Sequence, residues 1–427
     1  MEDILVQAAL SDQVGKAATF HRYDTSPEND SPMSFVLSYA QQDVAARIDL
    51  YWVEGGIPEL FCMQGFESKP IVYNTRYIEL SYLVRGLFRD GLDEVREELV
   101  ERTLLRVMAE LAVRYGDTEW AIRAFLQSIV GQSFFMLDSP GAALQQLELE
   151  PMGESYTATW FFGLAHEIGH LHAGQSSVST LDYFSKDQLK EALAICINMF
   201  PMPEDVRKKA LENAASGDPT FPLSFTRLAD EAYADLFAVF LISRVTQKMM
   251  QRSGLQFDIT QYIAETTLSL ALVSLLERCK RMALIASSRG LDNQQKDDLL
   301  FQPVTYAVRR LLIRPQFDSL VAKTLFHTIA PSADQHRQSV DLVNRIETQL
   351  QTDLDQVEKG LARAIRFALF PSERSSNLMR RFAQQVMDEP SGITRVHAKQ
   401  FCTLVESFHG DIESANAVRR IASAKRG

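Results

Sequence analysis

The sequence predicts an α+β protein that is predominantly helical, with one small antiparallel sheet near its N-terminus and additional helices at its C-terminus. The β-signal is confined to about residues 46–76, where apolar and aromatic residues dominate the runs 47–53, 58–63 and 70–73. Beyond Tyr77, apolar residues recur at helical spacing along almost the whole chain. Residues 23–33 are rich in Ser, Pro, Asp and Asn, so we expect a loop there.

The helical pattern divides into segments that end at recognisable stop signals. Gly174 follows one of them, and Pro201 and Pro203 follow another. We divide the chain into an N-terminal region of residues 1–150 that carries the sheet, a helical core of 151–345 and a C-terminal helical subdomain of 346–427. The expected helices are 92–114, 118–130, 156–172, 186–199, 204–215, 226–251, 258–288, 303–313, 316–326, 334–370, 375–388, 395–408 and 411–424.

Composition and charge narrow the class of protein. The 427 residues are 46% hydrophobic and 23% charged, which is ordinary for a globular chain, and the net charge of −11 argues against a broad nucleic-acid surface. The four cysteines lie far apart and form no CxxC pair, so we expect a reducing compartment rather than a disulfide framework. No secretory signal is visible, and the most apolar stretch, residues 267–276, falls short of the roughly 20 residues that cross a membrane. These features predict a cytoplasmic protein with no nucleic-acid or membrane partner.

One short motif carries chemistry. Residues 160–174 read WFFGLAHEIGHLHAG, in which His166 and His170 are four residues apart and therefore share one face of a helix. Two neutral imidazole nitrogens so placed are good zinc ligands. Glu167 can reach a zinc-bound water without binding the metal, take its proton during attack on a carbonyl and pass the proton to a leaving amine. Gly169 permits close approach of a neighbouring element.

A zinc site of this type needs a third protein ligand and keeps a fourth position open. The continuation HExxHxxGxxH is absent, because Ala173 and Ser176 occupy the required positions. An acidic pair some 60 residues downstream supplies the alternative: Glu231 as the third ligand, with Asp235 four residues on to accept the other ring N–H of a ligating histidine. Asp230 is the nearest rival, but its side chain points about 100° away from that of Glu231 on a helix.

These residues resemble those of the gluzincin metallopeptidases, in which HExxH is followed by a Glu with an Asp four residues on. The motif E-x-x-A-D, here Glu231-Ala232-Tyr233-Ala234-Asp235, is similar to that of the intracellular bacterial HtpX-like, ImmA/IrrE-like and Lit-like (phage-exclusion) peptidases. The resemblance covers about residues 156–240. It implies a zincin-like core, a Zn²⁺ cofactor and hydrolysis of a protein or peptide substrate, and the Lit-like group implies cleavage of a host protein in response to infection. No aminopeptidase GxMEN element is present, which favours endopeptidase action.

Several points stay open at this stage. The edge strand to which a substrate would add is expected at 70–74 or at its neighbour 58–63. A donor for the developing oxyanion could come from five side chains, and Cys62 is considered as an inhibitory metal ligand. Two other functions compete with the endopeptidase: a non-enzymatic helical regulator with a structural zinc, and a zinc hydrolase acting on a non-peptide amide or ester. The five oxyanion candidates are His336, Arg337, His327, Tyr233 and Tyr306.

Overall fold

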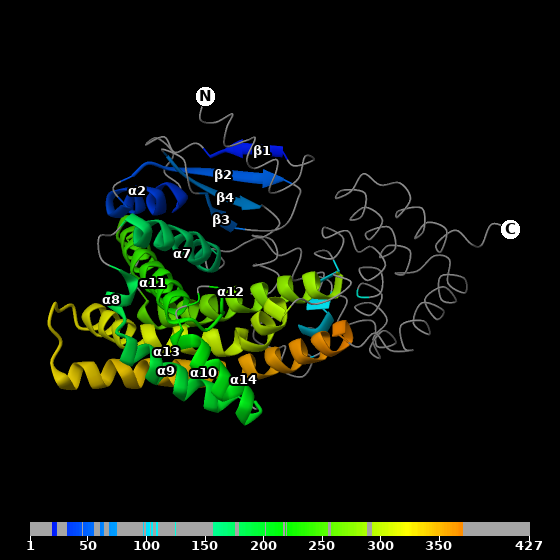
Figure 1. The fold of residues 1–427 in the computed structure, drawn as a ribbon. Helices are drawn as coiled ribbons and strands as arrows, with labels where there is room; N and C mark the ends of the chain where they lie inside the picture. The colour runs from blue at the N-terminus through cyan, green and yellow to red at the C-terminus, as the bar shows by residue number, and fades with distance from the viewer. Residues whose placement is uncertain are drawn as a thin grey trace, which may run out of the picture.

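The computed structural model describes residues 19–23, 32–44, 46–54, 60–63, 68–74, single positions between 97 and 124, and most of 157–369 (Figure 1). Across these residues the chain is mostly helical with one small sheet, as the α+β prediction requires. The described positions between 97 and 124 are helical, in agreement with the helices expected at 92–114 and 118–130. The helices expected at 375–388, 395–408 and 411–424 lie outside the described residues.

The sheet has four strands and mixed pairing. The strands are β1 (Thr19–Arg22), β2 (Ile48–Glu54), β3 (Leu60–Cys62) and β4 (Lys69–Asn74), in the spatial order β1-β2-β4-β3. The prediction of a wholly antiparallel sheet is wrong, because β4 lies between β2 and β3 and runs parallel to β2. Apolar alternation within a strand sets which residues face the core but does not encode the order of strands, so the sequence could not reveal this insertion.

Two N-terminal elements were not expected from the weak periodicity of residues 1–45. Strand β1 pairs antiparallel with β2, and helix α2 (Pro32–Val44) packs against β2 and the helical layer. Pro32 begins α2 at a position that suits proline, since the first helical N–H has no partner within the helix. Val36 and Leu37 of α2 are buried with Ile48, Leu50 and Ile71 of the sheet, which joins the sheet to the main core.

The helical layer follows the expected pattern closely in its first half. Helices α9 and α10 coincide with the predicted ranges, and α9 begins at a capping box in which Ser185 and Gln188 bond each other's backbone N–H groups. Helix α11 begins at the Ser224 cap and ends at Gly254, whose φ of 68° is available to glycine at little cost. The helices are α7 (Thr157–Gln175), α8 (Thr180–Tyr183), α9 (Lys186–Met199), α10 (Glu204–Ala215), α11 (Phe225–Ser253), α12 (Ile259–Ser287), α13 (Asn293–Leu325) and α14 (Ala333–Leu369).

Helix α13 differs from the prediction of two short helices at 303–313 and 316–326. It is one helix that contains Pro303 and Pro315. An internal proline removes a helical hydrogen bond and costs about 3 kcal/mol, but Val304, Val308 and Val321 of α13 are fully buried and hold the helix against its neighbours. Helix α14 runs without a break across residues 345 and 346, while a separate C-terminal subdomain stays a prediction.

Helix α7 lies between the sheet and α11 and contacts both β3 and β4 (Figure 1). Gly169 brings α7 and α11 together, since a Cβ built there would lie 2.7 Å from the Cα of Ala234. Among the residues that the structure describes, no helix is both long enough and apolar enough to span a membrane.

Candidate metal centre

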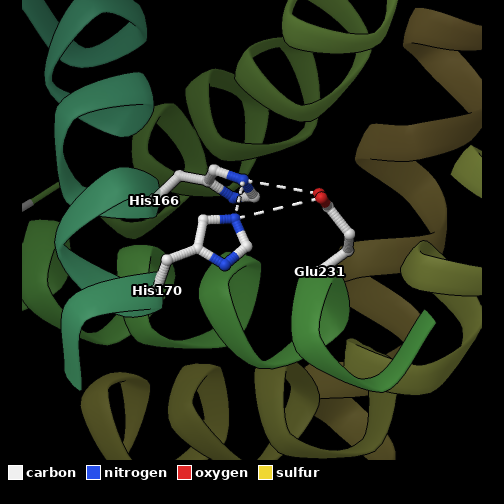
Figure 2. A group of neighbouring side chains, drawn as sticks. All are labelled: His166, His170 and Glu231. Atoms are coloured by element: carbon white, nitrogen blue, oxygen red, sulfur yellow. Dashed lines mark hydrogen bonds and ion pairs between the residues drawn. The ribbon is translucent and has the colours of Figure 1, made fainter. Parts of the chain in front are cut away.

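Three side chains predicted as metal ligands meet where α7 packs on α11 (Figure 2). His166 and His170 project from successive turns of α7, with 3.1 Å between their Nε2 atoms. Glu231 faces them from α11, with Oε2 at 3.5 Å from Nε2 of His166 and Oε1 at 3.9 Å from Nε2 of His170. We call these three residues the His–His–Glu cluster.

The spacing of these atoms could accommodate a metal ion. Zinc bonds to nitrogen and oxygen of about 2.0–2.1 Å place neighbouring tetrahedral ligands roughly 3.3 Å apart. The Nε2–Nε2 separation of 3.1 Å is close to that value, and the separations of 3.5 and 3.9 Å, which involve different oxygens of Glu231, are longer. Three protein ligands also leave the fourth tetrahedral position for water or substrate, as catalytic zinc sites require.

Asp235 lies behind the cluster, one helical turn beyond Glu231. Its carboxylate is almost completely buried and accepts a 2.9 Å hydrogen bond from Nδ1 of His166. A proton held on Nδ1 leaves the lone pair of Nε2 directed at the cluster, so Asp235 sets the tautomer that a metal needs. Asp230, the rival ligand, is not in the cluster; it accepts a hydrogen bond from the hydroxyl of Thr180 on α8.

Arg309 of α13 completes the site, and sequence reasoning missed it. Its guanidinium donates to both oxygens of Asp235, at 2.7 and 2.6 Å, and its Nη1 lies 3.0 Å from Oε2 of Glu231. Burial by itself would raise the pKa of Glu231, but Arg309 and the two histidines outweigh burial and hold that pKa well below its usual range. Two acids on one buried helical face need a counter-charge, and this was the available signal that a basic partner existed.

The two histidines differ in their affinity for a proton when no metal is present. Burial lowers the pKa of His166, but hydrogen bonds and charges from Asp235 and Glu231 overcome this and raise it to about 10. For His170, burial and the charge of His166 lower the pKa to about 4. At neutral pH, therefore, a metal ion that bound to the cluster would find one neutral imidazole and would have to displace a proton from the other.

Glu167, the residue after His166 on α7, interacts with strand β3 of the sheet. Its carboxylate accepts a hydrogen bond from the thiol of Cys62 in β3. Burial is the main cause that raises the pKa of Cys62 to about 12, and the negative charge of Glu167 adds to it. The thiol is thus protonated and bound to Glu167, and Cys62 is not one of the residues that the structure gathers into the cluster.

Among the described strands, the one that carries Cys62, the partner of Glu167, lies at the edge of the sheet. Strand β4, the first choice for a substrate-binding edge, is paired on both sides and cannot accept another strand. Strand β3 pairs only with β4 among the described residues, contacts α7 and carries Cys62. Of the two expected strands, the one at 58–63 therefore corresponds to β3, which lies at the edge of the described sheet and contacts α7.

The other sequence candidates lie elsewhere. The hydroxyl of Tyr233 is bonded to Nδ1 of His172, at 2.8 Å. His327 lies in the turn between α13 and α14, His336 and Arg337 are in the first turns of α14, and Arg337 pairs with Asp334 at 3.7 Å. In the described part of the chain none of these four side chains belongs to the His–His–Glu cluster, and Tyr306 lines a pocket beside α13. Comparison of the chain with protein-family models, with curated proteins and with solved structures finds no match.

Proposed function

We propose that this chain is a zinc-dependent endopeptidase of the gluzincin type that hydrolyses peptide bonds of a cytosolic protein. The observation that carries the proposal is the convergence of His166, His170 and Glu231, whose donor atoms all lie within 4.8 Å of one another although they come from helices far apart in sequence. A ligand set of two imidazoles and one carboxylate is typical of catalytic zinc.

The surrounding residues have roles that fit hydrolysis. A zinc ion in the cluster would polarise a substrate carbonyl and lower the pKa of a water molecule. Glu167, adjacent to the cluster but not part of it, accepts a proton from the attacking water and delivers it to the leaving amine. Asp235 holds His166 in position through a hydrogen bond to its ring. Arg309 holds the carboxylates of Asp235 and Glu231 through charge-assisted contacts.

The edge strand supports a peptide substrate over a small amide or ester. An extended peptide added to β3 would receive backbone hydrogen bonds along its length and would pass beside Glu167. A structural zinc site would require neither an edge strand, as β3 is among the described strands, nor an acid next to the ligands. These features together favour the endopeptidase over both alternatives.

The test combines metal analysis with mapping of cleaved proteins. Purified wild-type chain, Glu167→Gln and the control Glu191→Gln, an exposed glutamate on α9, are each analysed for zinc and then incubated with a cytosolic protein extract. We expect about one zinc per chain in all three, as for a single four-coordinate site, and new protein termini with the wild type and the control only. Absence of zinc from the wild type would overturn the proposal. Zinc with identical termini from all three proteins would assign the cluster a structural role.

A further inference from the structure

A pocket lies on the side of α13 that carries Tyr306, Ala307 and Arg310. This pocket has a volume of about 490 Å³, opens to the surface and is lined by α9, α12, α13 and α14. Small-molecule sites in proteins have volumes of roughly 300–1,000 Å³ and mainly apolar walls. The pocket meets both conditions, since most of its surface is apolar.

Three of the apolar residues that line the pocket are exposed at the surface. Ile195 and Met199 of α9 and Leu311 of α13 line the pocket, with 48%, 72% and 38% of their surface exposed. Single exposed apolar residues are common, but a group of them around a cavity marks a binding site more often than chance placement. The α9–α13 side of the pocket therefore favours an apolar ligand.

The arginines that line the pocket form ion pairs with glutamates that also line it. Arg278 pairs with Glu358 at 2.5 Å, and Arg310 and Arg314 both pair with Glu347, at 2.6 and 2.5 Å. Each of these lining arginines already has a carboxylate partner, so a charged ligand would have to displace an existing ion pair. The pocket thus selects against ionic ligands and in favour of uncharged ones.

Helix α13 connects this pocket to the His–His–Glu cluster. Arg309 holds Asp235 and Glu231 on one face, and the next residue, Arg310, holds Glu347 in the pocket wall. Tyr306, one turn earlier, lines the pocket. Arg309 and Arg310 are adjacent in the same turn of α13, so this turn contacts the cluster through one residue and the pocket wall through the next.

We propose that the pocket between α9, α12, α13 and α14 binds an uncharged, mainly apolar small molecule, and that this binding is coupled to metal binding through residues 306–310 of α13. A ligand there contacts Tyr306, Ala307 and Arg310, and any shift of this turn moves the guanidinium that positions Glu231. The coupling rests on the proposed function, whereas the ligand site does not.

The first experiment titrates the metal-free chain with prodan, an uncharged naphthyl ketone whose emission shifts to the blue in apolar surroundings. We expect saturable binding at one site, tighter than that of the anionic probe anilinonaphthalene sulfonate. Hydrogen exchange of the wild-type chain should show slower exchange in 195–200 and 306–314 when prodan is bound. Protection confined to other segments, no saturable binding, or preference for the anionic probe would overturn the ligand site.

Variants then locate the site by filling it. Ala307→Trp on α13 and Ala271→Trp on α12 each place an indole in the pocket, and either should weaken prodan binding at least about tenfold, which corresponds to about 1.4 kcal/mol. The matched control, Ile329→Trp, adds the same side chain at a position that is 92% exposed in the α13–α14 turn, and it should leave binding unchanged. Circular dichroism confirms folding of each variant. Unchanged binding by both filled and folded variants would overturn the ligand site.

The coupling is measured as a pair of affinities. Thermodynamic linkage requires that prodan change the affinity for zinc by the same factor by which zinc changes the affinity for prodan, and coupled sites typically differ by about 5–150-fold. A factor of one in both directions would overturn the coupling. If the chain binds no zinc, the proposed function fails, while the prodan titration and the filled variants still decide the ligand site.

Discussion

The contact between α7 and α11 can be tested at Gly169, where the effect of one methyl group follows directly from the geometry. A Cβ at this position would lie 2.7 Å from the Cα and 2.9 Å from the carbonyl oxygen of Ala234, and 3.1 Å from the Cβ of Phe237. Ordinary contacts begin at 3.4 Å, so the nearest atoms must separate by about 0.7 Å. Two of the three atoms belong to the backbone of α11 and cannot rotate away, so the helices themselves must move.

The expected cost of Gly169→Ala combines two effects of opposite sign. Alanine in place of glycine within a helix ordinarily stabilises it by about 0.5–1 kcal/mol. Forcing an additional methyl group into a packed core costs typically about 1–3 kcal/mol, and rigid backbone neighbours favour the upper part of that range. We expect a net loss of about 1–2 kcal/mol in the free energy of unfolding. Separation of the helices should also weaken zinc binding, because His166 and His170 lie on α7 and Glu231 on α11.

Gly174→Ala is the matched control, since it makes the same change on the same helix with no heavy atom within 4 Å of the new Cβ. Urea denaturation of the metal-free chain gives the change in stability, and competition with a coloured chelator gives the zinc affinity. Gly174→Ala should be as stable as the wild type or more stable, with unchanged zinc affinity. Equal stability and equal zinc affinity of the two variants would refute the reasoning that Gly169 sets the distance between α7 and α11.

Four further predictions concern the cluster and its neighbours. Asp235→Asn should weaken zinc binding about 10–100-fold, whereas Asp230→Asn, whose carboxylate bonds Thr180, should not; equal losses in a chelator competition would contradict this. Arg309→Met leaves Asp235 without its counter-charge and should cost about 3–5 kcal/mol in urea denaturation; a stability equal to that of the wild type would exclude the ion pair. The pKa of His166 is raised to about 10, so its protonation stabilises the metal-free chain fully below the unfolded pKa of 6.5, and this stabilisation is lost as the pH rises through 10. Because zinc must displace this proton, zinc affinity should increase as the pH is raised towards 10. An affinity independent of pH would exclude a protonated His166. Glu167→Gln removes a charge that raises the pKa of Cys62, so alkylation of the Cys62 thiol should accelerate. The pKa of Cys196 is raised by burial alone, so its rate of alkylation should stay constant. Mass spectrometry of the labelled sites measures both rates, and equal acceleration would argue against the contact between Glu167 and Cys62.

Local signals predicted the elements that carry the cluster. Helices α9 and α10 match their expected ranges, and α7 and α11 extend by only a few residues beyond theirs. Helical periodicity and caps act over a few residues, so a single sequence is enough to read them. The prolines of α13 misled the prediction, because their cost to the helix is offset by burial against α11, α12 and α14, which periodicity does not measure.

The sequence by itself determined which residues share a helical face: His166 with His170, and Glu231 with Asp235. Only the tertiary structure decided that the two pairs face each other, that Arg309 joins them, that Cys62 of β3 covers Glu167, and that β4 is inside the sheet. The physical reason is the range of the interactions. Spacing along a helix is fixed by backbone geometry, whereas contacts between residues many positions apart depend on how all the apolar faces pack together.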